Sequence, residues 1–232
     1  MLVSHAHKFI FIKTAKTAGT AVELLFERLM MPSDHLVTEA CGQQISEFGI
    51  IGARGRFSPS EQPLYFNHIP AKKLKWLLGR STWDSYYKFS IVRNPFESLL
   101  SGFFYTIQSN QQSFYESLMS AKFDDVQAYF EEYVMAKSND RNRELLTING
   151  QQAVDFCIRH EHLNTDISTV LSKLNLQADV SDLSSAKSGI RPSSGVLAGT
   201  KKFYRAHMIT HVTNVFRWHF ENFDYEFNSL PD

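Results

Sequence analysis

Two lysines and a run of small and hydroxyl residues follow the first strongly apolar segment of the chain. Lys13 ends the segment FIFIK, Lys16 lies three residues later, and a helical pattern of apolar residues begins near Thr20. A strand, a small-residue turn and a helix N-terminus bring backbone N–H groups and the positive end of the helix dipole to one point. The lysines add charge, and the hydroxyls of Thr17 and Thr20 add donors. The stretch 8–28 therefore predicts a phosphate-binding loop.

The order of residues in this loop differs from that of nucleoside triphosphatases. Their motif GxxxxGK[ST] places the lysine after the glycine, whereas Lys16 precedes Gly19 here. The second strong strand candidate, YYKFSIV at 86–92, is followed by Arg93 and not by a carboxylate that could hold Mg²⁺. Two lysines and an arginine without such a carboxylate suit an anionic nucleotide that is used without a metal ion.

The elements that must position these residues alternate between strands and helices. Strands are expected at 9–13, 64–67, 86–92 and 154–158. Helices are expected at 20–30, at 71–78 with Gly79 as the stop, from Pro95 onward, once or twice within 113–136, at 162–174 and at 201–222. Two strand–turn–helix units predict an α/β fold with parallel strands and crossover helices. We expect the insertion 32–63 to be loop with short helical pieces, and residues 1–232 to form one domain.

Composition limits the function classes. The formal net charge is zero, which argues against a chain whose main task is to coat nucleic acid or an anionic membrane. The two cysteines, Cys41 and Cys157, are far apart and form no CxxC pair, as in a protein with reduced thiols. No apolar run reaches the ~18 residues of a membrane span, and the first residues lack a signal-peptide pattern. We expect a cytoplasmic protein.

Two motifs together carry a resemblance to a known family. FIFIKTAKTAGTAVE, followed by FSIVRNPFESLLSGFFY, resembles the carbohydrate sulfotransferases that use 3′-phosphoadenosine 5′-phosphosulfate (PAPS). The nearest branch includes the uronyl 2-O-sulfotransferases and related bacterial enzymes, and the segment 155–176 is similar to a third family segment. The resemblance implies a P-loop-like three-layer α/β fold, in which helices flank a central, mostly parallel sheet.

The resemblance also implies a donor site. Lys16 would contact the bridging oxygen between the 5′-phosphate and the sulfuryl group. Arg93 would bind the 3′-phosphate in bidentate fashion, and Ser101, eight residues later, can face the same ligand. Lys13 is a further candidate ligand, with a plain charge at the sheet edge as the alternative. Donors to the 5′-phosphate would come from Thr17, Ala18, Gly19, Thr20 and Ala21.

Sulfuryl transfer to an alcohol also needs a base, and a neutral imidazole suits that task near pH 7. His68 follows an expected short strand between the two nucleotide motifs, where the resembled family places its catalytic histidine. The related 2-O-sulfotransferases carry a His-x-His pair at this point, whereas the earlier position here is Phe66. A structural histidine at a helix N-terminus is the alternative for His68.

Four other residues carry weaker signals. Lys187 and Arg191 lie in a Ser- and Gly-rich stretch that could close over the nucleotide or be an ordinary loop. His207 and His211 lie four residues apart and read as a metal pair or as a surface pair. We expect that no metal is required.

These patterns predict a PAPS-dependent sulfotransferase that acts on a glycan or on a small hydroxyl-bearing acceptor. One rival is a P-loop-like nucleotide kinase or other phosphotransferase. Another is a nucleotide-binding module without catalysis. The acceptor and the oligomeric state stay open at this point.

Overall fold

A computed structural model of the chain describes residues 1–55, 62–180, 192, 194–227 and 230–231. The chain divides into two compact units. The sheet unit comprises Met1–Val92 and Asn142–Ala186, and the helical unit comprises Arg93–Arg141 and Lys187–Asp232. Both phosphate motifs begin from strands of the sheet unit, whereas the helix after Arg93 belongs to the helical unit.

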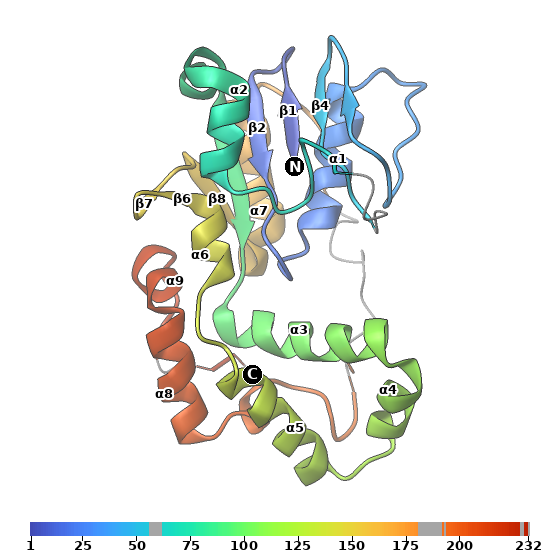
Figure 1. The fold of residues 1–232 in the computed structure, drawn as a ribbon, viewed down its shortest axis with the longest axis vertical. Helices are drawn as coiled ribbons and strands as arrows, with labels where there is room; N and C mark the ends of the chain where they lie inside the picture. The colour runs from blue at the N-terminus through green and yellow to red at the C-terminus, as the bar shows by residue number, and fades with distance from the viewer. Residues whose placement is uncertain (56–61, 181–191, 193, 228–229, 232) are drawn as a thin grey trace. The chain divides into compact units, whose positions relative to one another are not determined.

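The sheet unit is built on six strands of the described residues, in the order β3-β4-β1-β2-β5-β8 (Figure 1). The strands are β1 Leu2–Ser4, β2 Phe9–Ile12, β3 Gln44–Ile45, β4 Gly49–Ile51, β5 Tyr87–Val92 and β8 Phe156–Arg159. β2 pairs in parallel with β5, with Ile12 opposite Ser90, and β5 pairs in parallel with β8. The carboxyl ends of β2 and β5 therefore lie at the same edge of the sheet.

The prediction of a mostly parallel sheet is wrong, because the other three pairings of these strands are antiparallel. β1 and β2 form a hairpin, and the insertion after the first helix adds β3 and β4. The prediction of short helical pieces is wrong for the described part of the insertion, 32–55 and 62–63, where the regular elements are the strands β3 and β4. The strand expected at 64–67 is reduced to a single bridge between Ala53 and Phe66.

Helices cover both faces of this sheet, as the three-layer prediction requires (Figure 1). α1 (Gly19–Met30) and α7 (Leu163–Lys173) pack on one face over a shared apolar core. In that core Phe26 of α1 lies 4.7 Å from Phe89 and 5.6 Å from Phe9, measured between ring centroids.

α2 (Ala71–Ser85) lies on the other face, where Lys88 Nζ donates to the carbonyl oxygen of Trp83. The backbone leaves the helical conformation at Gly79, which has φ 75°. The predicted helix 71–78 with a stop at Gly79 is therefore the first half of α2.

Smaller elements complete the sheet unit. α6 (Arg141–Leu146) leads into a hairpin of β6 (Thr147–Ile148) and β7 (Gln151–Gln152), and a 3-10 turn at His160–His162 precedes α7. Neither α6 nor this hairpin was predicted, because the polar run around them has no periodic apolar pattern.

The helical unit contains α3 (Pro95–Asn110), α4 (Gln112–Met119), α5 (Phe123–Met135), α8 (Ala206–Val215) and α9 (Arg217–Asn222). Aromatic residues fill its core, as in the edge-to-face contact of Phe130 with Phe203. The long helix predicted at 201–222 is broken into a 3-10 turn (Lys201–Phe203), α8 and α9, with Phe216 between the two helices. Within the described ranges, no helix combines the length and the apolar character that crossing a membrane requires.

Candidate active site

The loop between β2 and α1 has an unusual backbone. Lys16 and Ala18 both adopt φ 61°, the left-handed region that residues other than glycine rarely enter. Each such residue costs on the order of 1–3 kcal/mol and persists only where its surroundings fix it. Ala18 is the N-cap of α1 and makes no side-chain cap bond. We keep the name phosphate-binding loop for residues 13–18, and the role that the name implies stays a prediction.

Two buried threonines fix this loop against the neighbouring strand. Thr14 donates its hydroxyl to the carbonyl oxygen of Ile91 on β5, and the Oγ1 atoms of Thr14 and Thr17 lie 2.8 Å apart. Both residues are about 1% exposed. The hydroxyl of Thr17 therefore points into the protein, which leaves its backbone N–H as the group for a ligand. Thr14 was not predicted as a site residue.

Lys13 also turns inward. Its Nζ lies 2.7 Å from Glu23 Oε2, and the residue is 5% exposed. Its aliphatic stem passes Gly19, where an added Cβ would come within 2.9 Å of Lys13 Cγ. Gly19 is thus required for close packing between α1 and this lysine, and not for a positive φ.

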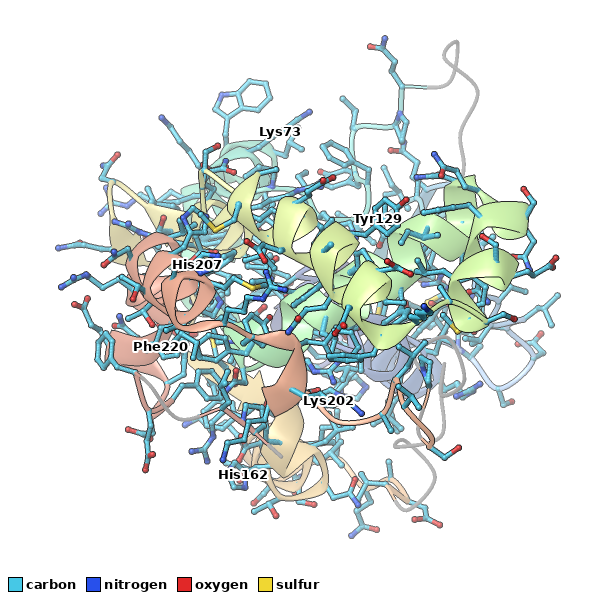
Figure 2. The ribbon with its side chains drawn as sticks, turned by 90° about the horizontal axis from the view of Figure 1, so that it is seen from below. Lys73, Tyr129, His162, Lys202, His207 and Phe220 are labelled. Atoms are coloured by element: carbon cyan, nitrogen blue, oxygen red, sulfur yellow. The ribbon has the colours of Figure 1, made fainter. Side chains whose placement is uncertain are left out.

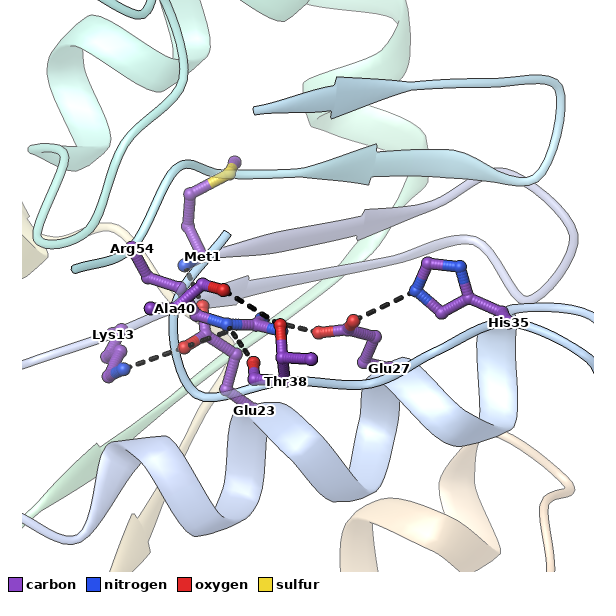
Figure 3. Close-up of polar contacts among 8 residues, drawn as sticks. All are labelled: Met1, Lys13, Glu23, Glu27, His35, Thr38, Ala40 and Arg54. Atoms are coloured by element: carbon purple, nitrogen blue, oxygen red, sulfur yellow. Dashed lines mark hydrogen bonds and ion pairs between the residues drawn. The ribbon is translucent and has the colours of Figure 1, made fainter. Parts of the chain in front are cut away.

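Lys13 belongs to a buried network of charges around Glu23 and Glu27 of α1 (Figure 3). Glu23 also pairs with the α-amino group of Met1, and Arg54 pairs with Glu27. Burial alone would raise the pKa of Glu23, but the Met1 amine and Lys13 outweigh it and lower that pKa to about 2. The network was not predicted, although two glutamates four residues apart on the apolar side of a helix are a signal that could have shown it.

His68 lies just before α2 in a left-handed backbone conformation, with φ 58°. Its Nδ1 lies 3.1 Å from the backbone carbonyl oxygen of Lys13, and the ring is partly buried. The predicted base is therefore bonded to the residue that leads from β2 into the phosphate-binding loop.

The predicted 3′-phosphate residues lie at the start of the helical unit. Asn94 caps α3 by accepting from the N–H of Phe96 over 2.9 Å, and Arg93 precedes it. The guanidinium of Arg93 lies 2.8 Å from Glu97 Oε2, and Glu97 also accepts from the hydroxyl of Thr200. Within the described part of the chain, Nε of Arg93 is buried and has no hydrogen-bond partner.

Glu97, the ion-pair partner of Arg93, was not predicted, although its spacing of four from Arg93 is a signal for such a pair. The spacing of four from Glu97 to Ser101 places both on one face of α3. Ser101 is partly exposed. Arg93 and Ser101 are thus described within one unit, and Lys16 and His68 within the other.

The remaining candidates do not join these groups. Lys187 and Arg191 lie outside the described residues. His207 lies on α8 (Figure 2) and pairs with Glu131. His211 Nε2 lies 2.9 Å from the carbonyl oxygen of Lys137. The two histidines therefore have separate partners. The described ranges contain no group of three His, Cys, Asp or Glu side chains that could hold a metal.

Comparison with known proteins adds one finding. A family model described as the sulfotransferase family matches residues 1–226, which include every candidate residue above and all but the last six residues of the chain. No curated protein and no solved structure matches the chain.

Proposed function

Because the chain belongs to the sulfotransferase family, we propose that it transfers the sulfuryl group of PAPS to a hydroxyl group of a glycan. The observation that carries this proposal is the hydrogen bond from His68 to the carbonyl oxygen of Lys13, at 3.1 Å. It joins a candidate base to the strand end from which the phosphate-binding loop starts. A general base beside an anion-binding loop is what sulfuryl transfer to an alcohol requires.

The residues on the 5′ side fit the donor. The left-handed residues Lys16 and Ala18 and the N-terminus of α1 offer backbone N–H groups to a 5′-phosphate. The ammonium of Lys16 supplies the positive charge that stabilises the departing phosphate oxygen. PAPS, when bound, supplies the sulfuryl group, which moves in line from the 5′-phosphate oxygen to the acceptor oxygen.

The residues on the 3′ side fit a phosphate monoester. The buried, unpartnered Nε of Arg93 is a donor without an acceptor in the described chain, and a guanidinium binds phosphate through two parallel N–H bonds. Arg93 directly follows β5, whose carboxyl end lies beside that of β2. A second phosphate site is what a donor with a 3′-phosphate, such as PAPS, requires.

His68 is the base in this proposal. A carbonyl oxygen only accepts, so Nδ1 carries the proton and Nε2 carries the lone pair of the neutral ring. Nε2 takes the proton of the acceptor hydroxyl as its oxygen bonds to sulfur. The second imidazole of the related 2-O-sulfotransferases has no counterpart here, since Phe66 occupies that position beneath the ammonium of Lys73.

The surface next to His68 supports an anionic acceptor. α2 begins three residues after His68, and Lys72 and Lys73 in its first turn are exposed. Cations at a helix N-terminus oppose the helix dipole. Lys73 also packs over Phe66, so it is chiefly Lys72 whose presence there favours a role in binding a ligand. Trp76, 78% exposed on the same helix, offers a flat apolar face on which a sugar ring can pack. A glycan that carries carboxylates or sulfates can pair with the lysines and pack a sugar ring on Trp76.

The test is to incubate the protein with PAPS labelled on sulfur and a panel of neutral, uronic acid-containing and sulfated glycans, with small alcohols alongside. We expect label on an anionic glycan without added Mg²⁺. Transfer of phosphate from ATP that depends on Mg²⁺ would instead make the chain a phosphotransferase. Tight binding of adenosine 3′,5′-bisphosphate with no transfer to any acceptor would make it a binding module.

A further inference from the structure

A single asparagine far along the chain holds the phosphate-binding loop. The backbone N–H of Ala15 donates to Asn142 Oδ1 over 2.9 Å, and Asn142 Nδ2 donates to the carbonyl oxygen of Ala15 over 3.1 Å. One side-chain amide thus satisfies both backbone groups of one residue, as a neighbouring strand would. Ala15 lies beyond the end of β2, where the strand ladder has stopped.

The contact of Asn142 lies next to the strained part of the loop. Ala15 directly precedes Lys16, the first left-handed residue of the loop. Strained residues of this kind keep their conformation only when their surroundings fix them. The hydroxyl of Thr14 fixes that residue against β5. The side chain of Asn142 fixes the backbone of Ala15, the next residue. Asn142 lies 127 positions from Ala15, and both belong to the sheet unit.

We propose that Asn142 is a positioning residue for the 5′-phosphate site. It holds Ala15 so that the N–H groups of the loop and the ammonium of Lys16 are aimed before the nucleotide arrives. This role rests on the proposed function, because it assumes that the loop binds the 5′-phosphate of the donor. Asn142 does not touch the reacting atoms in this role, and it acts only through Ala15.

The residue type agrees with this role. A planar amide offers one acceptor and two donors, so asparagine can bond an N–H and a C=O of the same residue at once. Aspartate at this position would lose the donor and would place a negative charge against the carbonyl oxygen of Ala15. Alanine would leave both backbone groups of Ala15 without this partner.

Three nucleotides separate a positioning role from a general structural one. Adenosine 3′,5′-bisphosphate and adenosine 5′-monophosphate both use the 5′-phosphate site, whereas adenosine 3′-monophosphate does not. We expect Asn142→Ala to weaken binding of the first two about tenfold, the size of one or two lost hydrogen bonds. Binding of adenosine 3′-monophosphate should stay unchanged. Asn142→Asp should weaken the binding of adenosine 3′,5′-bisphosphate and of adenosine 5′-monophosphate further. Titration calorimetry on the full chain measures all three.

Asn164, exposed on α7 of the same unit, is the matched control. Asn164→Asp adds the same charge to the sheet unit and should change none of the three affinities. An equal loss for all three nucleotides in the Asn142 variants would overturn the proposal, as would an unchanged affinity for the 5′-phosphate ligands. If thermal unfolding shows that Asn142→Ala is not folded, the same three affinities are compared for the near-isosteric Asn142→Asp. A wild-type protein that binds none of the three nucleotides would refute the proposed donor itself, and this role with it.

Discussion

His68 donates a hydrogen bond from Nδ1 to the backbone carbonyl oxygen of Lys13, over 3.1 Å. Lys13 follows β2 and lies three residues before Lys16. The orientation of the imidazole is therefore set by the same backbone that leads into the phosphate-binding loop. In the proposed reaction this bond keeps the lone pair on Nε2 and fixes the position of the imidazole relative to the loop.

The first prediction follows from the backbone of His68. At φ 58° a glycine is well tolerated, so His68→Gly removes the ring with little strain. We expect sulfuryl transfer to fall by about 10²–10⁴-fold, the usual contribution of a general base. Affinity for adenosine 3′,5′-bisphosphate should stay the same, and imidazole added to the buffer should restore part of the rate. Transfer at the parental rate would refute the base assignment.

The second prediction concerns Gly19. Gly19→Ala places a methyl group 2.9 Å from Cγ of Lys13, whose Nζ is held by Glu23. We expect about 1–3 kcal/mol lower stability, as for other overpacked sites, and weaker nucleotide binding because α1 begins here. Urea unfolding and nucleotide titration measure the two effects. Gly42 is the control, since a Cβ there meets no heavy atom within 4 Å, and Gly42→Ala should change neither quantity.

The elements that carry the phosphate motifs were predictable because their signals are local. β2 is a continuous apolar run, and Asn94 and Pro95 mark the start of α3. The contact of Asn142 was not predictable, and the network around Glu23 left only one signal, two glutamates on the apolar side of α1. Charged residues on a helix are expected to face solvent, and a lone asparagine in a polar run says nothing of a partner 127 positions away. Strand order is likewise set by tertiary pairing and not by the strands themselves.

The third prediction concerns acid stability. The pKa of Glu23 is lowered from 4.5 to about 2, so its stabilising contribution is present above about pH 4.5 and is lost as pH falls toward 2. For a fully buried carboxylate this shift corresponds to about 3 kcal/mol. Denaturant unfolding between pH 6 and pH 2 measures it.

Glu23→Gln should flatten that part of the pH dependence and lower stability at neutral pH, since Lys13 and the Met1 amine lose their charged partner. Glu221, half exposed on α9, supplies the control, and Glu221→Gln should leave the curve as it is in the wild type. If the stability of Glu23→Gln falls with pH as steeply as that of the wild type, Glu23 is not the group that causes the acid dependence.

The fourth prediction separates the two phosphates of the donor. Arg93→Ala should weaken adenosine 3′,5′-bisphosphate by about 10–100-fold, the value of a charge-assisted hydrogen bond. Adenosine 5′-monophosphate, which lacks the 3′-phosphate, should bind as before. Arg93→Lys should recover only part of the loss, because an ammonium lacks the bidentate fork. Equal losses for both nucleotides would show that Arg93 supports the fold and does not bind the 3′-phosphate.

The last prediction tests the surface of α2. Reversing two exposed charges with Lys72→Glu and Lys73→Glu should raise the KM for an anionic glycan by about 2–10-fold, because single exposed charges contribute about 0.2–1 kcal/mol each. The effect should shrink as salt rises from 0.05 to 0.5 M, since screening shortens the reach of exposed charges. Nucleotide affinity should not change, which separates an acceptor effect from damage to the donor site. Lys173→Glu, on exposed α7 surface, reverses one charge elsewhere on the sheet unit. If it raises the KM as much as each α2 reversal does, net charge and not the α2 surface governs acceptor binding.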